Sequence, residues 1–265
     1  MTIPAWADAS RSRRAGYQLL GARLAYLLHL RPTEWPIMAA HTAVGYFLAV
    51  GVPGAFQGTR MGQGIFGLLL WVVFLNGGTL AVNSAFDRDE GDIGYLRRPP
   101  PPPRHLFAWS LVLMLAGQGL AFLLPLEFAW AYAACLLLSV LYSVPPFRLK
   151  AVAGADWIIN MWGFGTLTVY AGWASTGVPL TTSGLFVLLA FCPLFAGLYP
   201  LTQLYQFEED QRRGDRTLAL MLGMRRSLDI AVLATLVAFA LFAAAGIRAG
   251  WGGGRSDLIR WGAVV

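Results

Sequence analysis

Charged residues are scarce in this sequence. They make up 13% of its 265 residues, whereas hydrophobic residues make up 57%. A soluble domain of this size carries about twice that charged fraction, so the composition excludes an ordinary soluble protein and favours a polytopic membrane protein. The net charge of +6 does not indicate a nucleic-acid partner, because the cations lie in short segments between apolar runs and cannot form a broad basic face.

Cysteine and lysine are rarer still. Cys135 and Cys192 lie inside apolar runs without CxxC spacing, so we interpret them as small packing residues and not as a disulfide or a metal site. The chain has one lysine, Lys150, which makes that position a candidate site residue. We expect no cleavable secretory signal at the N-terminus.

Several apolar runs approach the roughly 20 helical residues that a hydrocarbon core about 30 Å thick requires. We therefore predict an all-α, polytopic membrane bundle. Its seven spans are expected near residues 35–53, 65–86, 106–124, 126–142, 157–177, 184–207 and 229–247. Residues 1–30 are predicted to be a cytoplasmic segment with an interfacial amphipathic helix, and residues 31–265 a single transmembrane domain.

The cations cluster on one predicted side of the membrane, while the opposite loops hold only Arg60 before the C-terminal tail. Lys and Arg in short loops are retained in the cytoplasm, so the N-terminus is predicted to be cytoplasmic in the cell membrane. The clustered cations are Arg11, Arg13, Arg14, Arg88, Arg97, Arg98, Arg104, Arg148, Lys150, Arg212, Arg213, Arg216, Arg225 and Arg226.

Acidic residues concentrate in two short stretches on this same side. They are Asp87, Asp89, Glu90 and Asp92 after the second span, and Glu208, Glu209, Asp210 and Asp215 after the sixth. The two stretches are four spans apart and share a pattern of apolar run, amide, acids and arginines, which resembles a weak tandem duplication of a four-helix unit. Charge at a span boundary usually only keeps a helix end in water, so a functional interpretation needs further support.

Helical spacing gives that support. Asn83, Asp87 and Glu90 are four and three residues apart, so they share one helix face. Asn83 also lies within an apolar run, where an unpartnered amide is costly to bury and is a functional candidate. The second stretch repeats the spacing with Gln206, Glu209, Asp210 and Arg213.

Oxygen ligands without nearby His or Cys suit a hard cation such as Mg²⁺, which takes carboxylates, waters and phosphate. Carboxylates about 6 Å apart repel by roughly 3 kcal/mol per pair at an effective dielectric near 20, so positive charge is expected among them. Arg148 and Lys150 lie on the same predicted side. Mg²⁺ bridging carboxylates to a diphosphate, with these cations on the leaving group, would ionise an allylic diphosphate.

These residues resemble the motifs of the UbiA-type intramembrane prenyltransferases, which carry Asn-Asp-x-x-Asp-x-x-x-Asp after one helix and Asp-x-x-x-Asp after another. The first motif corresponds to "NSAFDRDEGD", which starts at Asn83. "YSVPPFRLK" and "GDRTLA" are further landmarks, and the resemblance covers roughly residues 30–247. It implies a helical fold around a central cavity, two Mg²⁺ ions, and transfer of a prenyl group to an aromatic or lipid acceptor among membrane lipids.

The resemblance also assigns roles to individual residues. Asn83, Asp87, Asp210 and Lys150 are the expected catalytic residues; Lys150, Arg148, Arg97, Arg98 and Tyr142 the expected diphosphate contacts; and Asn83, Asp87, Glu90, Asp92, Gln206, Glu209 and Asp210 the expected metal ligands. Glu90 or Asp92 would replace the aspartate missing at Gly91, and Glu209 would restore the charge missing at Gln206. The family has nine spans, so we expect either a chain shortened at its C-terminus or a cavity closed in another way.

Three functions remain open at this point. The first is prenyl transfer to an acceptor. The second is a terpene cyclase of the same superfamily, in which the prenyl chain attacks its own cation. The third is a non-enzymatic transporter or scaffold whose acidic loops bind ions or stay wet.

Overall fold

The computed structural model describes residues 10–87, 92–205, 207–214 and 216–250, without the side chains of Tyr205, Glu209 and Arg213. The described residues form helices and two isolated β-bridges, but no β-strand. The predicted all-α class is therefore confirmed.

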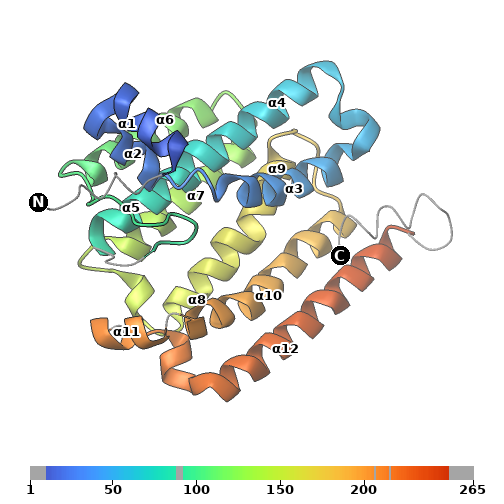
Figure 1. Ribbon diagram of the computed structural model, residues 1–265. Coiled ribbons are helices and arrows are strands. Elements are labelled where there is room, and N and C mark those ends of the chain that lie inside the picture. The colour runs from blue at the N-terminus through green and yellow to red at the C-terminus, as the bar shows by residue number, and fades with distance from the viewer. Residues whose placement is uncertain (1–9, 88–91, 206, 215, 251–265) are drawn as a thin grey trace, which may run out of the picture.

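The N-terminal segment forms helices too short to cross a bilayer. These are α1 (Arg11–Leu20), the 3₁₀ turn η1 (Gly21–Arg23) and α2 (Leu24–His29). Ser10 caps α1, because its hydroxyl accepts a hydrogen bond of 3.3 Å from the backbone N–H of Arg13. Figure 1 shows α1 and α2 beside α5 and α6 at one end of the bundle.

Among the described residues, helices lie in each of the predicted spans, and five helices are long and apolar enough to cross a membrane. The elements are α3 (Trp35–Ala55), α4 (Gly58–Leu69), η2 (Leu70–Gly77), α5 (Gly78–Asp87), α6 (Leu106–Ala121), α7 (Leu126–Ser143), η3 (Leu149–Ala151), α8 (Ala155–Asn160), η4 (Met161–Leu167), α9 (Thr168–Ala174), α10 (Thr182–Tyr205), α11 (Phe207–Arg213) and α12 (Leu218–Arg248). The segments α4–η2–α5 and α8–η4–α9 are each continuous.

Two of the spans contain a π-helix. In the second span it is η2, with the sequence LWVVFLNG, and in the fifth span it is η4, with the sequence MWGFGTL. π-Helical turns are rare and often lie at functional sites, because the extra residue per turn shifts which side chains face inward. Both π-helices border the cavity described below.

The first and fifth spans cross with their backbones almost in contact. A Cβ atom built on Gly45 would lie 1.7 Å from the carbonyl oxygen of Val169, and one built on Gly172 would lie 1.8 Å from that of Thr42. Glycine at both positions permits this approach. The contact is reciprocal, and its equivalent positions, Thr42 with Val169 and Gly45 with Gly172, are each 127 residues apart, as a tandem duplication of four helices predicts.

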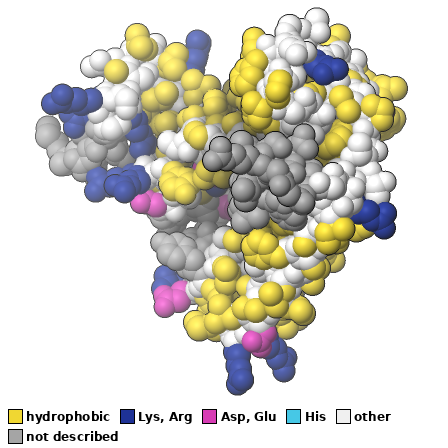
Figure 2. All heavy atoms as spheres, turned by 90° about the vertical axis from the view of Figure 1, so that its right-hand side faces the viewer, with side chains coloured by type: hydrophobic (Ala, Val, Ile, Leu, Met, Phe, Trp, Pro, Cys, Tyr) yellow, Lys and Arg dark blue, Asp and Glu magenta, His cyan; other side chains and the backbone are white. Residues whose placement is uncertain are grey.

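Hydrophobic side chains fill the interior and also cover the surface. Trp71, Phe128 and Tyr132 pack together among α4 to α7, and Phe191 packs against Phe242 where α10 lies along α12 (Figure 1). Much of the face shown in Figure 2 is hydrophobic, and the charged side chains visible there lie mostly towards its margins. An apolar outer surface of this kind suits contact with lipid.

Hydrogen bonds and a β-bridge join the connecting segments at one end of the bundle. His29 contacts the carbonyl oxygen of Pro100 at 3.0 Å, Val152 bridges to Arg216, and the backbone N–H of Leu218 donates to Asp156. This end therefore gathers the segments that follow α5, α7 and α11 beside the N-terminal helices. The candidate site lies here.

Candidate active site

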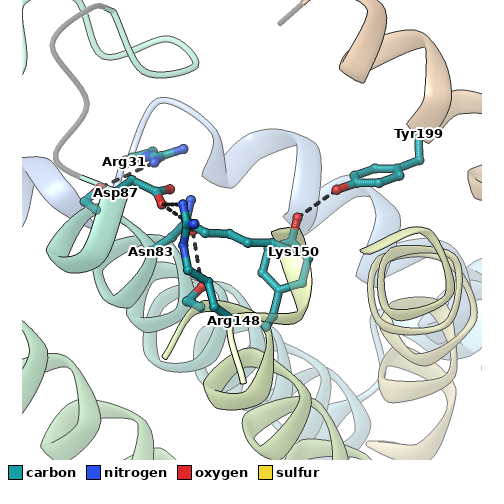
Figure 3. A network of polar contacts seen from close by, with 9 residues as sticks. Arg31, Asn83, Asp87, Arg148, Lys150 and Tyr199 are labelled. Carbon is teal, nitrogen blue, oxygen red and sulfur yellow. Dashed lines mark hydrogen bonds and ion pairs between the residues drawn. The ribbon is translucent and has the colours of Figure 1, made fainter. Parts of the chain in front are cut away.

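Asn83 and Asp87 lie one turn apart at the end of α5, and both interact with Lys150. The Nζ atom of Lys150 donates a hydrogen bond of 2.8 Å to Asn83 Oδ1 and forms an ion pair with Asp87 Oδ1. The side chains are nearly buried, since 7% of Asp87 and 11% of Lys150 is exposed. The structure thus brings together three residues that the sequence placed in the site (Figure 3).

The segment after α7 places two cationic side chains near Asp87. Ser143, the last residue of α7, donates a hydrogen bond of 3.2 Å to Asn83 Oδ1. Arg148 has a left-handed backbone with φ of 37°, which L side chains rarely adopt, and its Nη2 atom lies 4.0 Å from Asp87 Oδ1. The same short loop therefore directs Arg148 and Lys150 towards one carboxylate.

Arg31 supplies a third cation that the sequence did not predict. Its guanidinium is almost fully buried and donates a hydrogen bond of 3.3 Å to Ser84 Oγ, and it lies 3.7 Å from Glu34. Burial raises the pKa of Glu34, and the charge of Arg31 offsets part of that rise. Figure 3 shows Arg31 close to Asp87, away from Arg148. A signal was present in "HLRP", where a single arginine ends an amphipathic segment just before a span.

Among the described residues, three cations surround the carboxylate of Asp87. Buried cations are costly unless an opposite charge accompanies them. An anionic ligand at this position would meet Arg31, Arg148 and Lys150 together. The described geometry therefore suits a phosphate-bearing ligand.

The site opens into a cavity of about 210 Å³ between the second, fourth and fifth spans. Asn83 and Tyr142 line it at the end where the cations lie. Its apolar walls are formed by Met38, Trp71, Leu75, Leu80, Cys135, Leu138, Ile159, Gly163 and Phe164, and its polar lining by Asn76, Thr79, Asn83, Ser139, Tyr142, Asn160 and Thr168. A largely apolar cavity beneath a cationic mouth suits an amphipathic ligand with an anionic head and an apolar chain.

The second acidic stretch contributes Asp210 to this region. Asp210 lies on α11, is 9% exposed, and interacts electrostatically with Tyr142 at the cavity. It follows Asn83 by 127 residues, the same separation as in the reciprocal glycine contact. By contrast, Glu208 is exposed and pairs with Arg212 at 3.4 Å. Asp210 is therefore the described carboxylate of this stretch that lies near the cavity.

Three expected metal ligands lie outside this description. Glu90 and Gln206 are not among the described residues, and the side chain of Glu209 is not described. Their roles stay predictions.

Hydrogen bonds to its backbone groups hold the segment after α5 in place. Asp92 is exposed, and its Oδ1 atom accepts a hydrogen bond of 2.8 Å from the backbone N–H of Arg98. Arg13 donates hydrogen bonds of 2.9 Å to the carbonyl oxygens of Arg97 and Arg98. These hydrogen bonds order the segment but do not assign a function to it, so the functional roles of Asp92, Arg97 and Arg98 stay predictions.

A buried hydrogen-bond network behind the site was missed from the sequence. Asp156 is fully buried, and it accepts hydrogen bonds from the backbone N–H groups of Gly154 at 2.8 Å and Leu218 at 3.2 Å and from Gln203 Nε2. Gln203 Oε1 in turn accepts a hydrogen bond of 3.1 Å from the backbone N–H of Ala219. The network ties α8, α10 and α12 together. The single acidic residue in "GADWIIN" was the sequence feature that could have indicated this network.

Tyr142 meets a partner that the sequence did not indicate. Its hydroxyl lies 2.7 Å from that of Tyr199, so the two residues join α7 to α10 beside the cavity. Figure 3 shows Tyr199 across from the Lys150 cluster. Tyr142 therefore borders the proposed ligand space and also links two spans.

The described donors fit a hard cation. No group of three His, Cys, Asp or Glu side chains suited to a metal is found in the described part of the chain. However, Asn83 Oδ1 and Asp87 Oδ1 together bind the ammonium group of Lys150, which stands in for a cation held by one amide and one carboxylate oxygen. Mg²⁺ takes few protein ligands of this kind and completes its shell with water and phosphate.

An all-helical bundle whose apolar cavity ends at an Asn–Asp pair and clustered cations is the architecture expected of an intramembrane prenyltransferase. The chain matches the model of the UbiA prenyltransferase family over residues 9–254 and belongs to that family. It is thus an integral membrane prenyltransferase, and family membership favours an enzyme over a non-enzymatic transporter or scaffold.

Named relatives and solved structures agree with this assignment. The chain is 29% identical over 243 residues to a lycopene elongase/hydratase of Haloferax volcanii, covering 87% of this chain and 76% of that protein. It is 29% identical over 179 residues to a digeranylgeranylglyceryl phosphate synthase of Methanothrix thermoacetophila, covering 64% and 63%. A UbiA homolog from Archaeoglobus fulgidus bound to GPP and Mg²⁺ superposes with a TM-score of 0.75 at 21% identity, covering 91% and 83%. The predicted UbiA-like fold is confirmed.

Proposed function

We propose that this prenyltransferase transfers the prenyl group of an allylic diphosphate to a lipid or isoprenoid acceptor, with Mg²⁺ as its cofactor. The observation that carries the proposal is the position of Lys150, Arg148 and Arg31 around Asp87 at the mouth of an apolar cavity. The names of two relatives concern isoprenoid lipids, which favours a lipid over a small aromatic acceptor.

The proposed placement is in the cell membrane, with the site on the cytoplasmic side. Residues 1–30 form a cytoplasmic segment with an interfacial helix, and residues 31–265 form one transmembrane domain. The distribution of cations along the sequence supports this orientation.

Ionisation of the diphosphate is the first chemical step. The bond between C1 of the prenyl group and its diphosphate oxygen breaks, and both electrons pass to the leaving diphosphate. Lys150, Arg148 and Arg31 stabilise the negative charge that develops there. Asn83, Asp87 and Asp210 would hold Mg²⁺, which would supply further positive charge to the diphosphate.

The cavity then controls the fate of the allylic cation. Its apolar walls exclude bulk water, and the ring faces of Trp71 and Phe164 offer negative potential to a cation beside them. The acceptor attacks C1, a new bond forms at that carbon, and the acceptor loses a proton.

Removal of either motif carboxylate tests this proposal. Asp87→Ala and Asp210→Ala should each abolish Mg²⁺-dependent release of pyrophosphate from GPP. Each substitution removes a negative charge that would hold the metal and, through the metal, the diphosphate. Release is measured with the purified full-length protein, and product analysis separates an acceptor adduct from a cyclic hydrocarbon, which would indicate the cyclase alternative.

Glu127→Ala is the matched control. Glu127 is an exposed carboxylate in the first turn of α7, at the other end of the bundle, so its removal should leave pyrophosphate release near the wild-type rate. Comparable expression and membrane insertion of the three variants establishes that loss of activity is local. Full activity in the Asp87 or Asp210 variant would refute that residue's assignment.

A further inference from the structure

One polar side chain in the cavity wall has a donor without a partner. Asn76 lies in the π-helix η2, lines the cavity, and is only 5% exposed. Its Nδ2 atom is buried and has no hydrogen-bond partner in the structure. Burying an unpaired amide in an apolar setting is costly, so this position calls for a partner.

The neighbouring polar side chains on the same wall are satisfied. Thr79 Oγ1 and Ser139 Oγ lie 2.8 Å apart, Thr168 donates to the carbonyl oxygen of Gly163 at 2.9 Å, and Asn160 donates to that of Asp156 at 2.8 Å. The fold therefore pairs polar groups in this cavity where it can. Asn76 differs from them in leaving a donor unused.

Packing on the other faces of η2 and α5 fixes the direction of Asn76. A Cβ atom at Gly77 would lie 3.4 Å from Leu30, and one at Gly78 would collide with Met114. The backbone here is therefore pressed against the N-terminal segment and against α6. Rotation of the helix to carry Asn76 away from the cavity is blocked on both sides.

The position of Asn76 along the cavity indicates that it would meet the acceptor. It precedes Asn83 by seven residues, which is about 10 Å along a helix. A diphosphate at the Asn83 end places the reacting carbon further in, and the attacking acceptor lies beyond that carbon. A polar atom of the acceptor would thus lie near the depth of Asn76, whose amide can turn to present a donor or an acceptor.

We propose that Asn76 binds a hydroxyl or carbonyl oxygen of the acceptor and so selects an oxygen-bearing lipid over a hydrocarbon of the same shape. The inference rests on the proposed function, because it identifies the bound molecule as the acceptor. A site that hydrogen-bonds a polar group discriminates against an analogue lacking that group, since its own donor is then left unpaired.

Binding of two matched probes tests the assignment. Phytanol and phytane share one branched chain and differ by a hydroxyl group. Their affinities for the full-length protein in nanodiscs are measured without Mg²⁺ or diphosphate. Wild type should bind phytanol about tenfold more tightly than phytane, the ratio expected of one hydrogen bond. Asn76→Leu and Asn76→Ala should both reduce the ratio to about twofold or less.

Gln118→Ala is the control, because Gln118 is a part-buried amide on α6 that is bonded to the carbonyl oxygen of Ala129 and does not line the cavity. It should keep the wild-type preference. Asn76→Ala removes the amide without adding bulk, so a preference that survives in this variant overturns the proposal, as does an absence of preference in wild type.

Thermal stability gives a second readout. Asn76→Leu should unfold at the wild-type temperature or above, because the buried amide nitrogen that it removes has no hydrogen bond to lose. A clear fall in its unfolding temperature, or failure to fold, would show that the amide has a structural partner and would overturn the proposal. The proposed function fails separately, if wild type releases no pyrophosphate from GPP with Mg²⁺.

Discussion

Lys150 combines two functions at the scale of a single residue. Without a ligand, its ammonium group neutralises Asp87 and hydrogen-bonds to Asn83. These are the same oxygen atoms that fit Mg²⁺. With Mg²⁺ held by these oxygens, Lys150 would be able to contact the diphosphate. We therefore expect this side chain both to neutralise Asp87 and to assist the leaving group.

Lys150→Met separates these functions. The variant should lose at least about 100-fold in kcat/KM for GPP, because a charge on the leaving group is removed. It should also unfold at a lower temperature than wild type without Mg²⁺, since Asp87 becomes a buried charge with fewer partners, and Mg²⁺ should restore part of that loss. Kinetics and thermal unfolding with and without Mg²⁺ measure both effects.

Arg212→Met is the control for Lys150→Met, because the Arg212 side chain is 79% exposed and pairs only at the surface. Such pairs contribute little, so this variant should match wild type in both measurements. Equal Mg²⁺ responses of Lys150→Met and wild type would contradict the shared use of Asp87.

Glu34 gives a prediction for pH. Burial raises its folded-state pKa above the ordinary value of 4.5, and Arg31 only partly offsets this. The folded state therefore holds the proton more tightly, so the contribution of Glu34 to stability is complete below pH 4.5 and is lost as pH rises through the folded pKa. Relative to wild type, Glu34→Gln should unfold at progressively higher temperature as pH rises from about 4.5 to neutrality.

Thermal unfolding of Glu34→Gln and wild type across that pH range checks the sign. The comparison is made at each pH, so that other titrating groups contribute equally to both proteins. A difference that stays constant, or one that grows as pH falls, would contradict the burial of Glu34 as the cause.

The sequence predicted part of the site because part of it is local. Asn83 and Asp87 share a helix face by spacing alone, and the segment with Arg148 and Lys150 carried the rare lysine. Arg31 and Gln203 could not be assigned in this way, since their contacts with Ser84 and Asp156 join residues 53 and 47 positions apart.

The reciprocal crossing of α3 and α9 is the clearest feature at the scale of elements. Gly45 and Gly172 each face a backbone carbonyl of the other helix. Backbone atoms cannot move aside as a flexible side chain can. The crossing therefore sets the distance between the first and fifth spans. In the fifth span, α9 continues directly from η4, which lines the cavity.

Gly45→Ala or Gly172→Ala should destabilise the fold by about 3 kcal/mol or more, because a methyl group at either position overlaps a carbonyl group. The double variant should cost less than the sum, since either methyl group already separates the helices. Thermal unfolding in detergent measures this. Gly119→Ala is the control, because nothing lies within 4 Å of a Cβ atom there; an equal effect at Gly119 would refute the steric cause.

The length of the apolar runs predicted which segments form spans. It did not predict the residues at which the helices begin and end. The last span was predicted to begin near residue 229. α12 begins earlier, at Leu218, and its helical geometry is broken at Gly223 (φ of 76°), after which the long part of the helix follows. The reason is tertiary: Asp156 accepts the N–H of Leu218, and Gln203 Oε1 accepts that of Ala219. Side chains from α8 and α10 thereby cap α12 in place of a local N-cap. The lengths of the apolar runs likewise did not predict the π-helices η2 and η4.

At the scale of the whole molecule, the fold separates charge between the two ends of the bundle. The segments that join at the site end carry Arg13, Arg31, Arg98, Arg148 and Lys150 beside the motif residues. The short turns at the other end, between α6 and α7 and between α9 and α10, carry no Lys or Arg. Positive charge in short loops favours the cytoplasm, so this charge distribution predicts that the site end faces the cytoplasm.

Cysteine labelling tests this orientation in a background of Cys135→Ala and Cys192→Ala. Ser12 is exposed on α1 at the site end, and Thr59 is exposed at the start of α4 at the other end. A membrane-impermeant maleimide should label Thr59→Cys in intact cells but label Ser12→Cys only after permeabilisation, because the charge asymmetry retains the site end in the cytoplasm. The reverse pattern would place Asp87 and Lys150 outside the cell and would refute the proposed orientation.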